Sequence, residues 1–212
     1  MQLVDAIQQR KTIKLFNPNV KIPRAELAEM LTLAQLAPSK ANLQPWRFVV
    51  IDDPIQKAKL ENIVAFNYPP CESASAVIII LADLQYHRLL EKILDRSIEK
   101  GCLNEAFKQR NLDFLTSTHN ALTEQEIRDQ VLIDTSLASM QLMLIAKDKG
   151  YDTHAIGIFD KSEVLAHFDI DANRFAPVML LAIGKAAVPP LPSARLTLDN
   201  TVVWNSGMAL LK

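Results

Sequence analysis

The sequence predicts a single domain, residues 1–212, in which helices cover a buried β-sheet. Three apolar runs rich in β-branched residues have the length and composition of strands, namely 46–51, 75–81 and 177–183. Two segments repeat apolar residues at helical spacing, namely 25–37 and 132–149. With 49% hydrophobic and 22% charged residues, a chain of this length can bury a sufficient core by itself.

The N-terminal third should place two helices ahead of the first strand. Leu3 and Ile7 form a short helical stripe that runs into a cluster of cations beginning at Arg10. The second helix, over 25–37, should stop at Pro38, because proline cannot continue a helix. Residues 38–44 are therefore expected to form a loop, and a further helix is expected over 55–64, between the first two strands.

The remaining elements are less evenly patterned. Residues 86–128 are polar with intermittent leucines, which indicates partly exposed helices and a variable excursion. The segment 132–149 has little polar face, so this helix should be buried or lie in an oligomer interface. Asp160 and Glu163 resemble a capping box that opens one more helix. From residue 188 the chain is proline-rich and apolar up to Met208 and beyond, which indicates an extended arm that needs a surface to cover.

Charge and cysteine content exclude several classes of function. The formal net charge is -1, so no broad basic field is present for nucleic acid or an anionic membrane surface. The first ten residues are amphipathic and do not resemble an export signal, and the longest apolar run is too short to cross a bilayer. Two cysteines offer neither a disulfide framework nor a zinc knuckle and fit a reducing compartment, so a cytoplasmic location is expected.

Familiar catalytic and phosphate-binding motifs are missing from the sequence. With only 5 glycines, neither a dinucleotide-binding fingerprint nor a Walker loop can be written. The 4 histidines form no zinc-binding H-E-x-x-H, and no serine lies in a G-x-S-x-G. No metal site is expected, and any phosphate must be held by side chains.

Two polar segments remain as candidate binding sites. Arg10, Lys11, Thr12 and Lys14 place three cations and a hydroxyl within five residues, a combination suited to a phosphate. Taken alone, the same cations could simply complement the C-terminal dipole of the first helix. The loop 38–44 alternates amides with apolar residues, and amides can recognise the edge of a heteroaromatic ring. An ordinary turn would explain that loop equally well.

Together the two segments resemble the nitroreductase family. Residues 10–16 read RKTIKLF, similar to the family's R-[RH]-S-x-[RK]-x-F, and residues 37–48 read APSKANLQPWRF, similar to its A-P-S-x-x-N-x-Q-P-W-x-F. The likeness continues at Asn67, at residues 155–160 (AIGIFD), which resemble P-x-G-G-[FY]-D, and at residues 190–195 of the proline-rich arm. It spans the chain apart from residues 86–128.

The resemblance implies an α+β fold with a mainly antiparallel sheet and a homodimer that exchanges its C-terminal arms, residues 188–212. It also implies a bound FMN, with NADH or NADPH as reductant and a nitroaromatic, quinone or flavin as acceptor, in a ping-pong cycle. No residue is assigned as a catalytic acid or base. The cofactor-binding residues implied are Arg10, Lys11, Thr12, Pro38, Ser39, Lys40, Asn42, Gln44, Asn67, Ile156, Gly157, Ile158 and Arg195, with Lys14 toward the substrate.

Within that set, Arg10, Lys11 and Thr12 would hold the FMN phosphate and ribityl end together with Arg195. Ser39, Asn42 and Gln44 would reach the flavin from the other subunit, and main-chain groups near Gly157 and Ile158 would face its N5 and O4 edge. Asn67 would lie near the flavin.

Three positions depart from the family pattern. Ala155 replaces the proline of the P-x-G-G motif. Ile158 replaces the second glycine of the P-x-G-G motif and adds bulk where the family has none. Ser193 stands where many relatives have a second basic residue, so phosphate binding would depend more on the remaining cations. The alternatives left open are a flavin-dependent dehydrogenase or dehalogenase of the same fold and a flavin-binding dimer without catalytic activity.

Overall fold

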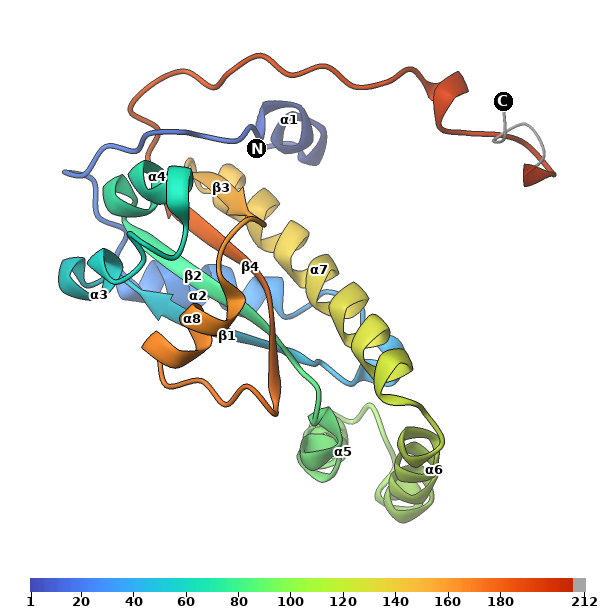
Figure 1. Cartoon of the computed structure of the whole chain (residues 1–212). Coiled ribbons are helices and arrows are strands. Elements are labelled where there is room, and N and C mark those ends of the chain that lie inside the picture. The colour runs from blue at the N-terminus through green and yellow to red at the C-terminus, as the bar shows by residue number, and fades with distance from the viewer. Residues whose placement is uncertain (208–212) are drawn as a thin grey trace.

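The computed structural model describes residues 1–207 and is built around a four-stranded antiparallel sheet (Figure 1). The strand order is β1-β2-β4-β3, formed by Trp46–Ile51, Ala76–Asp83, Phe175–Gly184 and Asp152–Ile156. The two central strands, β2 and β4, form the longest ladder, and all eight residues of β2 are buried. The expected α+β architecture with an antiparallel sheet is confirmed.

Helices cover both faces of this sheet. On one face lie α2, Arg24–Ala34, and the long helix α7, Glu124–Asp148, whose buried side chains pack with those of β2 and β4. On the other face lie α3, Pro54–Ala58, α4, Tyr68–Ser73, and α8, Lys161–His167, together with the chain around Ile13. Each fully buried Leu or Ile in these layers contributes about 1.5–3 kcal/mol.

The remaining helices lie at the two ends of the molecule in Figure 1. The first helix, α1, spans Leu3–Gln9, whereas α5, Leu90–Glu99, and α6, Lys108–Asn120, form the opposite end, and α6 buries none of its residues. Five short 3-10 turns complete the described elements: η1 Lys40–Asn42, η2 Ala65–Asn67, η3 Tyr86–Leu89, η4 Glu105–Phe107 and η5 Leu198–Asn200. Within residues 1–207, no helix has the length and apolar character needed to cross a bilayer.

Beyond β4 the chain leaves the body as an extended arm (Figure 1). Its apolar side chains face solvent, with Leu196 73% and Trp204 79% exposed. The expected apolar end from Met208 lies outside the described residues. The arm therefore presents the unpartnered apolar surface that the sequence indicates.

Several expected boundaries were wrong. The helix expected over 55–64 ends at Ala58, and residues 59–64 continue as tight turns with bonds such as Ile63 N to Leu60 O. The helix expected to end at 37 ends at Ala34, and the helix expected from 132 begins at Glu124. The strand β3 was not expected. Asp160 caps α8 by accepting from the Glu163 N–H, but only this half of a capping box is formed.

Candidate functional site

The basic segment after α1 runs beside the edge strand β3. The main-chain N–H of Ile13 donates to the carbonyl of Thr153 at 3.1 Å, and Thr12 forms a parallel bridge with the same residue. The Nδ1 of His154 donates to the carbonyl of Ile13 at 2.7 Å, since a carbonyl can only accept. Ile13 is thereby buried, whereas Thr12 and Lys14 stay exposed.

The cations of this segment have no acidic partner. Arg10, Lys11 and Lys14 form no ion pair with any residue in the described part of the chain. The nearby carboxylate of Asp152 is held by Lys147 at 2.9 Å. A cleft of about 410 Å³ adjoins Lys11, and its opposite wall is the root of the C-terminal arm, residues 186–190. The positive charge therefore remains available for an anion.

Asn67 and Gly157 follow residues that pack on the same face of the sheet as Ile13. The N–H of Asp160 donates to the carbonyl of Ile63 at 2.9 Å, which joins the loop after β3 to the turn before Asn67. Ile13, Ile63 and Ile156 share one apolar cluster. Asn67 is only 6% exposed, and its side-chain amide has no hydrogen-bond partner within residues 1–207. The amide is not among the buried polar atoms that lack a partner, so it reaches solvent and remains available to a ligand.

The space around the loop after β3 is open. A Cβ placed on Gly157 would meet no atom within 4 Å, and the Ile158 side chain is 68% exposed. Ile158 therefore projects away from the protein core at a point where a flat ligand could approach the main chain. The added bulk found in the sequence therefore lies on the solvent side of this loop.

The second motif, residues 38–44, forms a strained loop. Ala41, Asn42 and Gln44 adopt left-handed backbone conformations, with φ of 49°, 58° and 48°. Such angles cost free energy in residues other than glycine and persist where the surroundings enforce them. Two bonds do so here: Ser39 Oγ accepts from the Gln44 N–H at 3.0 Å, and the Lys40 N–H donates to the Asp134 carboxylate at 3.2 Å.

Two buried carboxylates that sequence reasoning missed support this loop. Asp134 lies on α7, and burial raises the pKa of its carboxyl. Asp83, at the end of β2, is completely buried and pairs with Arg47 at 3.0 Å and Arg174 at 2.8 Å. Arg47 in turn donates to the carbonyl of Gln44. The one available signal for Asp83 was a carboxylate that ends an otherwise apolar strand.

The structure does not bring the two motifs together within one chain. The loop 38–44 leads into β1, whereas the basic segment borders β3, at the opposite edge of the sheet. Three strand spacings, about 14 Å, separate these edges. The loop also packs against α7, on the face opposite to Asn67. Arg195 lies on the extended arm, and within residues 1–207 its side chain forms a hydrogen bond only with the carbonyl of Ala194.

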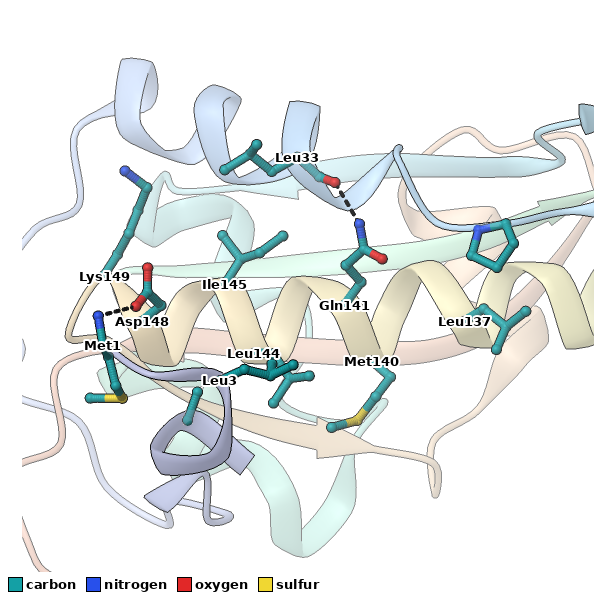
Figure 2. Close-up of a pocket in the computed structure, with 12 residues that line it drawn as sticks. Met1, Leu3, Leu33, Leu137, Met140, Gln141, Leu144, Ile145, Asp148 and Lys149 are labelled. Carbon is teal, nitrogen blue, oxygen red and sulfur yellow. Dashed lines mark hydrogen bonds and ion pairs between the residues drawn. The ribbon is translucent and has the colours of Figure 1, made fainter. Parts of the chain in front are cut away.

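An apolar groove of about 620 Å³ lies between α1, α2 and α7 (Figure 2). Figure 2 shows Leu137, Met140 and Leu144 of α7 pointing into it beside Leu3 of α1. Its polar groups are already engaged: the N-terminal ammonium pairs with Asp148 at 2.7 Å, and Gln141 donates to the carbonyl of Leu33 at 2.8 Å. The groove therefore offers apolar surface for packing against a partner rather than polar groups for binding a ligand.

Comparisons with known proteins identify the family. The model of the nitroreductase family matches residues 7–185. YdgI of Bacillus subtilis, which carries the name NAD(P)H nitroreductase, is 41% identical over 95% of this chain and 96% of its own length. A CLA biosynthesis enone reductase of Lactiplantibacillus plantarum is 37% identical over 91% of this chain and 89% of its own. The solved structure of a nitroreductase from Exiguobacterium sibiricum in complex with FMN has 37% identity and a TM-score of 0.94, covering 97% of this chain and 98% of that one. The chain therefore belongs to the nitroreductase family.

Proposed function

We propose that this protein is an FMN-dependent oxidoreductase that uses NADH or NADPH to reduce a small oxidised acceptor. The observation that carries the proposal is the pair of cations, Arg10 and Lys11, that have no acidic partner among residues 1–207, on the sheet face where the Asn67 amide also has no protein partner. A phosphate would neutralise the cations, and a ring edge with donors and acceptors would satisfy the amide. The FMN complex of the Exiguobacterium relative, at 37% identity, supports the same cofactor.

Each binding role follows from where the structure places the residue. Arg10, Lys11 and Thr12 would bind the phosphate and the ribityl end. Gly157 and Ile158, which follow Ile156 at the end of β3, would present their main chain to the N5 and O4 edge, where the open space allows close approach. When bound, FMN would supply electron transfer from NAD(P)H to the acceptor in a ping-pong cycle.

The chain's own residues would bind, orient and exclude water. Lys14 is exposed and without an acidic partner, so it would attract an anionic part of the nicotinamide nucleotide or of the acceptor. Ile158, exposed beside the site, would restrict how a bulky acceptor approaches the ring edge. No side chain is needed as a proton donor or acceptor at a fixed position.

The working unit we propose is a homodimer. One chain holds its two motifs at opposite edges of the sheet, so Pro38, Ser39, Lys40, Asn42 and Gln44 would complete the site of the second subunit. The apolar groove of Figure 2 would be covered by that subunit, because exposed apolar surface of this kind usually lies in an interface. The arm would cross the partner and bring Arg195 to the phosphate.

A second candidate acceptor is an enone. The enone reductase of Lactiplantibacillus plantarum is 37% identical to this chain over 91% of its residues, which makes reduction of a conjugated carbon–carbon double bond the alternative to nitro or quinone reduction. Both reactions use the same cofactor and reductant, and they differ in the acceptor that enters the site.

Anaerobic stopped-flow spectroscopy tests the proposal. The purified protein should be yellow, and NADH or NADPH should bleach its flavin absorbance rapidly. Menadione, nitrofurazone and a simple enone, added separately to the reduced protein, then identify the acceptor class by the rate at which the colour returns. Colourless protein that takes up no FMN would refute the proposal. A flavin that NAD(P)H fails to bleach would favour a dehydrogenase, a dehalogenase or a binding protein without catalysis.

A further inference from the structure

A second cleft adjoins the loop 38–44 and is lined by cations. Its volume is about 280 Å³, and it lies between the start of β1 and the helix α5. The charged groups on its wall are Arg47 of β1 and Lys92 and Arg96 of α5, while Leu89 and Ile93 supply apolar contact. Gln44, from the loop assigned above to the partner's flavin, also lines the cleft.

The guanidinium of Arg47 is held in a fixed position. Its Nη1 donates to the carbonyls of Gln44 at 2.8 Å and Trp46 at 2.6 Å, and its Nη2 donates to Asp83 at 3.0 Å. Its Nε–H has no partner in the described part of the chain, and the side chain is 27% exposed. An immobilised guanidinium with a free donor binds an oxyanion with little loss of conformational entropy.

The charges around the cleft do not cancel. Asp83 is shared between the guanidiniums of Arg47 and Arg174, so it compensates the charge of Arg47 only in part. Lys92 forms neither an ion pair nor a hydrogen bond with a described residue. Arg96 is offset by Glu99 at 2.7 Å. Lys92, together with the partly compensated Arg47, therefore leaves the wall with net positive charge, which a carboxylate or phosphate would neutralise.

We propose that this cleft binds the anionic end of a ligand whose other end reaches the flavin of the partner subunit. The chemistry recognised is a carboxylate or phosphate attached to an apolar or aromatic body, because the cations stand beside Leu89 and Ile93. The inference rests on the proposed function, since Gln44 connects the cleft to the flavin only in the dimer described above. It assigns an acceptor class, namely anionic acceptors, and gives α5 a direct part in specificity.

The anion could belong to the acceptor or to the phosphate of the nicotinamide nucleotide, and kinetics separates the two. The acceptors 4-nitrobenzoate and 4-nitrobenzamide have nearly the same shape and differ in charge. In Lys92→Gln combined with Arg96→Gln, KM for 4-nitrobenzoate should rise about tenfold, while KM for 4-nitrobenzamide and for NADH should stay unchanged. If the cleft instead holds a nucleotide phosphate, KM for NADPH or NADH should rise in place of the acceptor's.

Controls separate charge from structure. Lys92→Arg, which keeps the positive charge, should retain the wild-type affinity for 4-nitrobenzoate. Lys161→Gln removes an exposed cation at the start of α8 and should leave every KM unchanged. Titration calorimetry of benzoate and benzamide into the FMN-loaded protein adds a readout without turnover, in which only benzoate binding should weaken. If the double variant still binds FMN that NADH bleaches, and its KM for every ligand equals that of the wild type, this inference alone is overturned. Protein that binds no FMN, or whose FMN is not bleached, would overturn the proposed function first.

Discussion

The imidazole of His154 lies 2.7 Å from the carbonyl of Ile13, and this bond attaches the basic segment to the sheet. His154 is buried on β3, and burial lowers the pKa of its ring, against the hydrogen bond to Ile13, which raises it. A neutral ring with its proton on Nδ1 is sufficient for this bond. Protonation at Nε2 would place a charge in a site with little water, so the attachment of the segment depends on pH.

Stability should fall in mild acid. The folded-state pKa of His154 lies below its ordinary value of 6.5, and burial also lowers the pKa values of His87 and His119. As the pH falls, these histidines therefore take up protons in the unfolded chain before they do so in the folded protein. Their contribution to the free energy of unfolding is complete above pH 6.5 and is lost as the pH falls from that value toward the folded-state pKa values. Urea unfolding at several pH values checks this. His154→Asn should reduce the slope with pH, and an unchanged slope would contradict the assignment.

Arg195→Ala should weaken FMN binding by about 1.5–3 kcal/mol, the range for a lost hydrogen bond to a charged group. In the proposed dimer the arm brings Arg195 to the FMN phosphate of the partner subunit. Within residues 1–207 of one chain, the Arg195 side chain forms a hydrogen bond only with the carbonyl of Ala194. Fluorescence titration of apoprotein with FMN measures the change, and Lys161→Ala is the matched control. An unaltered dissociation constant would mean that the arm does not reach the phosphate.

Thr123→Ala should destabilise the protein by about 1 kcal/mol, because it removes the capping box of α7. In that box Thr123 Oγ1 accepts from the Glu126 N–H, and the Glu126 carboxylate accepts from the Thr123 N–H at 2.8 Å. The Glu126 carboxylate also accepts from the Thr123 hydroxyl, and its bonds from the N–H and the hydroxyl of Thr123 lower its pKa. Urea unfolding gives the free energy, and FMN affinity serves as the control, which should not change. A loss of FMN affinity would show that the start of α7 contributes to the site.

Asp83→Asn should cost about 3 kcal/mol, because it leaves the guanidiniums of Arg47 and Arg174 without their buried counterion. The value lies at the low end for broken buried pairs, since both guanidiniums reach solvent. Thermal and urea unfolding measure the loss. Because Arg47 also holds the carbonyl of Gln44, FMN affinity per folded dimer should fall as well, and a change in stability alone would limit Asp83 to a structural role.

The sequence predicted β1, β2 and β4 best, since β2 and β4 are mostly apolar and β1 is rich in aromatic and β-branched residues, a composition typical of strands. It missed β3, Asp152–Ile156, because a five-residue edge strand with polar members carries no clear alternation. It missed the true start of α7 although the Thr123 and Glu126 capping signal was readable. The end of α3 at Ala58 had no glycine or proline to mark it.

The candidate site was predictable as two motifs but not as an arrangement. Residue type and spacing pointed to Arg10, Lys11 and the loop 38–44, because local sequence carries that information. Their placement at opposite edges depends on the strand order, which pairs residues distant in sequence. The support by Asp83 and Asp134 was hidden for the same reason, since each acts on a segment more than thirty residues away.

Mixed dimers should recover activity that neither parent has. We expect Arg10→Ala combined with Lys11→Ala to remove the phosphate end, and Asn42→Ala combined with Gln44→Ala to remove the contribution of the loop. When the two inactive variants are co-expressed with different tags and the mixed dimer is isolated, one of its two sites should be intact, giving about half of the wild-type turnover. No recovery would place both motifs in the same subunit's site.

Because the two motifs occupy opposite edges of one sheet, a cofactor that needs both would act as a cross-link between subunits in the proposed dimer. Association and flavin binding then become one coupled equilibrium, in which each favours the other by mass action. Dilution would release FMN at concentrations where an isolated site would retain it, and free FMN would lower the concentration at which dimers form. The cell's supply of flavin would thus set how much of this protein is assembled as well as how much is loaded.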